Sequence, residues 1–217
     1  MGPVEPETLR LEGGAPGLLA LLARAEGLDA GALARLRDHG DGTVDVFTTT
    51  PFEVIASRRI WGAAGRDGAV VRVRDAREAL AGREDHPGEV LALGPACDPS
   101  WPGALPPAAG FRLVDTVPVA VVRSLADEGQ RLAREFSGPL GPPASLMNQD
   151  VLTVESKEGT AKIPMRMIFT CTSLGLIPGF KAGMDVPRYL RVSTVGRWIR
   201  IDAPFGTVYH STGLSLV

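Results

Sequence analysis

The chain of 217 residues lacks the sequence motifs that identify the common enzyme classes. It has no GxSxG nucleophile elbow, no GxxxxGKS/T phosphate loop, no GxGxxG dinucleotide fingerprint, no CxxC pair and no HExxH helix. These absences leave enzymatic activity open and favour a non-enzymatic protein. We therefore expect no catalytic residue, no metal site and no cofactor.

Cysteine and histidine are also scarce. Cys97 and Cys171 lie far apart without a spacing motif, which argues against a disulfide framework and predicts small buried side chains in a reducing compartment. The three histidines, His39, His86 and His210, are too scattered for a local metal signature. We expect each to be a surface residue.

Long apolar runs are absent as well. No run approaches the roughly 20 residues needed to span a bilayer, and the N-terminal residues lack the basic and apolar regions of a signal peptide. The sequence predicts a cytoplasmic protein without membrane contact.

Lysine is rare, and charge is unevenly distributed. All three lysines lie beyond residue 150, while arginine supplies the other 20 basic residues. Residues 151–217 carry eight basic and four acidic side chains, whereas residues 1–150 carry fifteen and 21. A basic end on an acidic body suits contact with an anionic partner, although a solvated basic face is the simpler alternative.

The first part of the chain predicts an α+β body with a mixed or antiparallel sheet. A leucine-rich segment predicts a helix over about 16–25, and an Asp29 cap predicts a second helix that ends at Gly40. Alternating residues over 43–49 and 52–60 predict a hairpin. Gly94–Gly110 contains too many prolines and glycines for either element and predicts a long loop.

The last part predicts a winged-helix-like module. The pattern gives a strand over 150–155, a helix over 161–174 and two strands over 189–193 and 198–203. The GPLGPP segment at 138–143 would separate it from the body. We therefore predict two domains, an α+β body over 1–140 and this strand–helix–hairpin module over 144–217.

Two groups of residues in this module are candidates for contact with nucleic acid or another partner. Arg166, Thr170 and Ser173 are spaced to form one stripe of the predicted helix, as a recognition helix requires. Arg191, Arg197 and Arg200 lie on the hairpin, where phosphate contact needs cations. Any amphipathic helix has a polar stripe, however, and cations also protect exposed sheet edges.

Trp101 is the candidate for a ligand pocket. It lies in the Pro-rich Gly94–Gly110 loop, and an aromatic ring on a rigid loop is common in small-molecule sites. The alternative is that Trp101 fixes the loop to the hydrophobic core.

Several segments resemble uncharacterised proteins from GC-rich actinobacteria. The similar segments are Leu105–Pro107, GFRLVDTVPV from Gly110, IPMRMI from Ile163, LGLIPG from Leu174, and GRWIRIDAPFGTVY from Gly196. The resemblance implies no substrate and no fold.

Three functions are compatible with these observations. The favoured hypothesis is a cytoplasmic regulator or adaptor whose basic C-terminal module contacts DNA or another macromolecule. The second is a small-molecule-binding protein or enzyme with a pocket under the Gly94–Gly110 loop. The third is a structural homodimer that pairs through its C-terminal hairpin.

Overall fold

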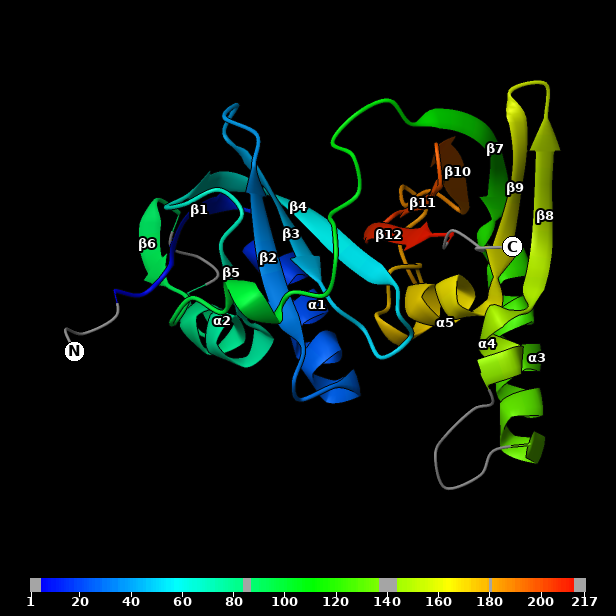
Figure 1. The fold of residues 1–217 in the computed structure, drawn as a ribbon, viewed down its shortest axis with the longest axis horizontal. Coiled ribbons are helices and arrows are strands. Elements are labelled where there is room, and N and C mark those ends of the chain that lie inside the picture. Colours follow the sequence, from blue (N-terminus) through cyan, green and yellow to red (C-terminus); the bar gives the residue numbers. More distant parts are fainter. Residues whose placement is uncertain (1–4, 84–86, 137–143, 180, 213–217) are drawn as a thin grey trace. The chain divides into compact units, whose positions relative to one another are not determined.

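The described residues of the computed structural model, 5–83, 87–136, 144–179 and 181–212, fall into two compact units (Figure 1). The first comprises Met1–Pro51 and Ile55–Ala104, and the second comprises Phe52–Val54 and Leu105–Val217. The division thus lies near residue 104. The predicted separator at 138–143 lies outside the described residues.

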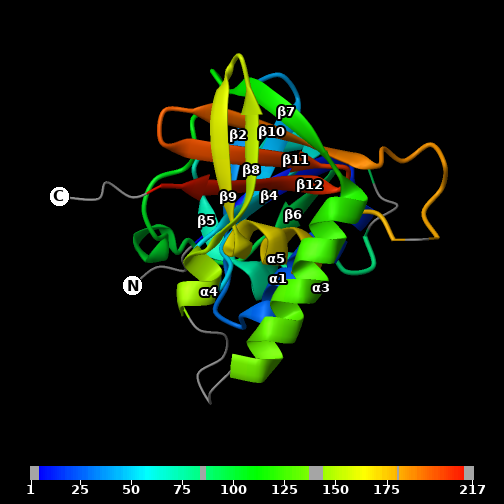
Figure 2. The same cartoon turned by 90° about the vertical axis from the view of Figure 1, so that its right-hand side faces the viewer.

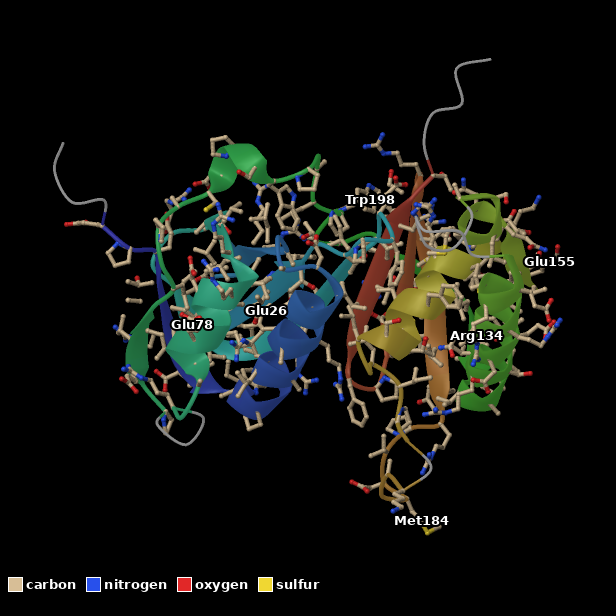
Figure 3. The ribbon with its side chains drawn as sticks, turned by 90° about the horizontal axis from the view of Figure 1, so that it is seen from below. Glu26, Glu78, Arg134, Glu155, Met184 and Trp198 are labelled. Carbon is tan, nitrogen blue, oxygen red and sulfur yellow. The ribbon has the colours of Figure 1, made fainter. Side chains whose placement is uncertain are left out.

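The first unit contains six strands, two α-helices and a short 3-10 helix in its described part. In chain order these are β1 (Thr8–Gly13), α1 (Ala15–Leu28), β2 (Leu33–Asp38), β3 (Thr43–Thr48), β4 (Ile55–Ala64), β5 (Val70–Arg72), α2 (Val73–Leu80), β6 (Glu89–Ala92) and η1 (Asp98–Ser100). Every strand pair is antiparallel, in the order β5–β2–β3–β4–β1–β6. The helices α1 and α2 lie side by side (Figures 1 and 3).

The core of the first unit follows from amphipathic patterns. Leu18, Leu21 and Leu22 of α1 are almost fully buried, as are Leu9 and Leu11, which alternate with exposed residues along β1. This is the period of two that lets one sheet face pack on helices while the other stays polar. The predicted helix over 16–25 and the hairpin over 43–60 are both present.

The predicted second helix is wrong, because residues 33–38 form strand β2. Leu33 and Leu36 are spaced for a helix, but β2 lies between β3 and β5 and is hydrogen-bonded to both. The Asp29 carboxylate does accept a hydrogen bond from the Gly31 amide at 2.8 Å, as part of a turn and not of a helix cap. Tertiary pairing overrides the local preference.

The described part of the second unit has six strands and three helices. They are β7 (Arg112–Pro118), α3 (Val119–Phe136), α4 (Ala144–Asn148), β8 (Asp150–Ser156), β9 (Gly159–Pro164), α5 (Met165–Ser173), β10 (Tyr189–Val195), β11 (Trp198–Ala203) and β12 (Gly206–Ser211). Within this unit the strands β12–β11–β10–β7 form an antiparallel array, while β8 and β9 form a separate hairpin. Figure 2 shows this hairpin lying across the β7–β10–β11 strands, with α3 beside it.

The structure therefore confirms an α+β fold with antiparallel strands but not the winged-helix-like module. Residues 159–164 are a strand, and the helix begins only at Met165. Pro164 explains the error, because the residue before a proline is driven to extended conformations and a helix starts after it. The order is strand, strand, helix and then three strands, with β12 not predicted from the sequence.

The predicted boundary also assigned β7 and α3 to the N-terminal body. In the structure β7 pairs with β10 along its whole length, and α3 packs on α5, so both belong to the second unit. The hydrogen bonds between β7 and β10 join segments more than 70 residues apart in the sequence. A local breaker signal at 138–143 contains no information about such pairing.

Candidate functional site

The predicted polar stripe of the C-terminal helix is buried. Arg166 is only 7% exposed, and Thr170 is fully buried. The Arg166 Nη1 group donates to the carbonyl oxygen of Phe52 at 2.9 Å and to Glu53 Oε2 at 2.6 Å, and Nη2 donates to Asn148 Oδ1. Arg166 thus has a structural position inside the second unit and cannot reach a DNA groove.

The rest of the stripe is buried or half-buried. The hydroxyl of Thr170 donates to the Arg166 carbonyl at 2.8 Å, one turn earlier in α5. Ser173 is half-buried at the end of the helix. The expectation of an exposed recognition face over Arg166, Thr170 and Ser173 is corrected, because α5 is surrounded by β9, β12, α3 and α4.

The three predicted hairpin arginines have different environments. Arg191 and Arg197 are exposed. Arg200 is half-buried: its guanidinium lies 4.5 Å from the centre of the Phe111 ring and forms an ion pair with Asp202 at 2.9 Å. Arg191 and Arg197 therefore keep their charge available, whereas Arg200 is engaged within the sheet.

Trp101 lies in the first unit and is only 8% exposed. The guanidinium of Arg35 stacks over its ring at 5.8 Å from the centroid. This environment is that of a side chain that fixes the Gly94–Gly110 loop to the body, the alternative considered from the sequence. The indole nitrogen has no hydrogen-bond partner among the described residues.

A pocket of about 360 Å³ lies within the second unit, at the end of the sheet where Trp198 is placed (Figure 3). It is formed between the β8–β9 hairpin and strands β10, β11 and β12. Its walls are Asn148, Asp150, Thr160, Ala161, Lys162, Pro164, Thr194, Gly196, Arg197, Trp198, Ile199, His210 and Thr212. One face of the sheet supplies Thr194, Ile199 and His210, which are neighbours across β10, β11 and β12.

Two exposed cations line this pocket from separate elements. Lys162 comes from β9, and Arg197 comes from the turn between β10 and β11. Within the part of the chain that the structure describes, neither side chain forms an ion pair, whereas Arg166 and Arg200 both do. The pocket therefore presents two positive charges that form no ion pair with any described residue, although Asp150 lies in the same wall.

His210 forms part of the pocket wall and is half-buried. Burial lowers the pKa of its imidazole below the usual value, and the positive charge of Arg166 lowers that pKa further; Glu53 and Asp150 act in the opposite direction. The ring is accordingly neutral near pH 7. It forms a hydrogen bond with the backbone of Glu53, but Nδ1 is buried without a partner among the described groups.

Sequence reasoning found Arg197 but missed Lys162 and His210. The sequence pattern puts Lys162 inside the predicted helix over 161–174 and predicts His210 as a surface residue. The signal for His210 is its register opposite Ile199, which puts it on the covered face of the sheet. His86 lies outside the described residues.

No group of three metal-ligating side chains occurs among the described residues. None of the helices in the described part of the chain has both the length and the apolar character that a membrane span requires.

Two family models match the chain, one for each of its two compact units. A domain of unknown function, DUF8185, matches residues 106–215, which is half of the chain. The chain belongs to the DUF8185 family. A second domain of unknown function, DUF8010, matches residues 5–103, so the border between the two matches coincides with the border between the two units. No curated protein is significantly similar to this DUF8185 chain.

Solved structures with a similar fold include sliding clamps. A DnaN sliding clamp (DNA polymerase III subunit beta) from Bartonella birtlesii, bound to griselimycin, is 10% identical with a TM-score of 0.54, over 97% of this chain and 66% of that one. The DNA polymerase sliding clamp of Caulobacter crescentus is 10% identical with a TM-score of 0.55, over 94% and 65%. That of Bacillus subtilis is 9% identical with a TM-score of 0.52, over 96% and 64%.

The DUF8185 chain spans less than two thirds of the length of these clamps. At such low identity the likeness establishes the fold alone. The fold is thus sliding-clamp-like, and the residues that line the pocket have to be interpreted from their own chemistry.

Proposed function

We propose that the DUF8185 chain is a non-enzymatic binding protein that contacts DNA through exposed cations of its second unit. The observation that carries this proposal is the pair Lys162 and Arg197, which lie on one pocket and have no ion-pair partner among the described residues. Cations free of intramolecular partners are the groups that bind phosphate and release its counterions.

Two further observations support contact with a macromolecule. The fold is shared with DNA polymerase sliding clamps, although fold alone does not transfer function. Arg191, exposed on β10, adds a third cation without an ion pair in the described part of the chain. Arg166 does not contribute to this contact, because it is buried and its Nη1 and Nη2 groups already donate to Phe52, Glu53 and Asn148.

The test is a fluorescence anisotropy titration of labelled duplex DNA at two salt concentrations. We expect the double variant Lys162→Ala/Arg197→Ala to bind more weakly and to reduce the salt slope by about 0.9 for each lost phosphate contact. The loss should be nearly independent of DNA sequence, since phosphate contacts carry no base information.

Arg10→Ala is the matched control, because Arg10 is an exposed strand arginine in the first unit. It should leave both affinity and salt slope unchanged. Absence of DNA binding by the intact protein at low salt would refute the proposal. In that event sedimentation would test another of the three hypotheses, self-association into a homodimer.

A further inference from the structure

The pocket of the second unit has two chemically different kinds of wall. Lys162 and Arg197 supply positive charge, while Asp150 and the neutral His210 supply hydrogen-bond acceptors. We propose that this pocket binds a small phosphate monoester that also carries hydroxyl or amino groups. The proposal concerns a free small molecule and goes beyond the contact with DNA proposed above.

The volume sets the size of the ligand. A pocket of about 360 Å³ lies at the lower end of the range, about 300–1,000 Å³, that small-molecule sites occupy. A sugar phosphate or a nucleoside monophosphate is of this size. A longer polymer segment would have to extend beyond the walls.

The two cations of the pocket suit a phosphate monoester. Near pH 7 such a phosphate carries about −1.5 to −2 charges, which Lys162 and Arg197 can offset. Asp150 in the same wall adds one negative charge, so the ligand must direct hydrogen-bond donors and not its phosphate toward that carboxylate. Arginine can bind two phosphate oxygens with its planar fork, and lysine adds a compact charge.

The acceptors define the other end of the ligand. Asp150 lies opposite Pro164 in the β8–β9 register. Lys162 precedes Pro164 by two residues in β9, which is about 6.6 Å along the strand. A carboxylate accepts hydrogen bonds and repels phosphate. Asp150 therefore favours an orientation in which the hydroxyl or amino groups of the ligand face Asp150 and the phosphate faces away from it. A donor that reached Nδ1 of His210 would satisfy that buried atom, which has no hydrogen-bond partner among the described residues.

The walls are held in place before any ligand binds. Asn148 Oδ1 accepts a hydrogen bond from the buried Arg166, which leaves the Asn148 amide nitrogen to donate. The carbonyl of Arg197 accepts two hydrogen bonds from Thr212, from the amide at 2.9 Å and from the hydroxyl at 3.1 Å. Such preorganisation lowers the entropic cost of binding.

The closing experiment is isothermal titration calorimetry of the full chain with adenosine 5′-monophosphate, glucose 6-phosphate, inorganic phosphate and adenosine. We expect at least one monoester to bind, inorganic phosphate to bind more weakly, and adenosine not to bind. Lys162→Ala and Arg197→Ala should each weaken monoester binding about tenfold or more. Lys157→Ala, which removes the exposed lysine at the tip of the same hairpin and outside the pocket, should leave it unchanged.

His210→Phe separates this proposal from the proposed function. It removes an uncharged acceptor and no positive charge, so we expect it to weaken monoester binding while DNA affinity and salt slope stay as in the unmodified chain. Thermal unfolding of each variant verifies that it is folded. A 5′-phosphorylated oligonucleotide serves as a competitor, and displacement of the monoester by it, but not by its 5′-hydroxyl form, would show that the pocket recognises a terminal phosphate.

Two results would overturn the inference. One is the absence of heat or chemical-shift change with every monoester at millimolar concentration. The other is monoester binding that Lys162→Ala and Arg197→Ala leave intact. DNA binding that persists in either case would leave the proposed function standing. Monoester binding without DNA binding would refute the proposed function and support the monoester pocket alone.

Discussion

At the residue scale, Asp45 on β3 is a buried carboxylate with several hydrogen bonds. Its carboxylate accepts hydrogen bonds from Arg59 Nε at 2.7 Å and Arg59 Nη2 at 2.8 Å, and it lies 2.8 Å from His39 Nε2. Burial raises the pKa of Asp45, but the hydrogen bonds from Arg59 and His39 more than offset that effect, so the net pKa lies below its usual value.

This low pKa gives a pH prediction for stability. A carboxyl whose pKa is lower in the folded state contributes stability above its unfolded pKa of about 3.9, and that contribution is lost as pH falls through the folded pKa. We expect Asp45→Asn to destabilise the chain at pH 7 and to differ much less from the unmodified chain near pH 3. Urea unfolding at both pH values checks this, and an equal difference at both would contradict it.

At the element scale, the contact of β1 with β4 depends on one glycine. Gly62 has a φ of 151°, and a Cβ atom there would lie 2.0 Å from the carbonyl oxygen of Arg10 on the neighbouring strand. Backbone atoms cannot yield as the end of a flexible side chain can. The close approach of these strands therefore requires glycine at position 62.

We expect Gly62→Ala to destabilise the first unit by roughly 3 kcal/mol, the upper part of the range for forced repacking. Gly27→Ala is the matched control, because nothing lies within 4 Å of a Cβ at this position near the end of α1. Replacement of a helical glycine should stabilise by up to about 1 kcal/mol. Urea unfolding curves of the two variants should thus shift in opposite directions.

At the scale of the whole molecule, the two units are not continuous in sequence. Phe52–Val54 interrupts the first unit and belongs to the second, where the Phe52 ring lies 6.3 Å from that of Phe169. The buried Arg166 binds this segment through the Phe52 carbonyl and the Glu53 carboxylate. Arg166 therefore joins a short, distant segment to the second unit.

Loss of this guanidinium should affect one unit selectively. We expect Arg166→Met to destabilise the second unit by about 2–3 kcal/mol, because the Phe52 carbonyl loses a charged donor. Hydrogen exchange measured by mass spectrometry should show faster exchange in β9 and α5 than in the unmodified chain, with β2 and β3 unchanged. Arg191→Met, which removes an exposed arginine from β10, should change stability by no more than about 0.5 kcal/mol, and an equal loss in both variants would contradict the assignment.

The sequence by itself determined the elements whose signal is local. The leucines of α1 and the alternation of β3 each predicted an element that is present, since side-chain periodicity acts over a few residues. The α+β class followed from the same patterns. Pro164 is a local signal of the same kind, because it marks the border between β9 and α5.

Only the tertiary structure decided the pairing partners and the site. Strand β2 resembles a helix locally and becomes a strand because β3 and β5 bond to both of its edges. Lys162, Arg197 and His210 are far apart in the chain and share one pocket only because the β8–β9 hairpin lies across strands β10–β12. Arg166 has the sequence features of a DNA-contacting arginine, yet the segment that binds its guanidinium is 113 residues away. Burial and long-range hydrogen bonding depend on the whole chain, and no window of the sequence contains them.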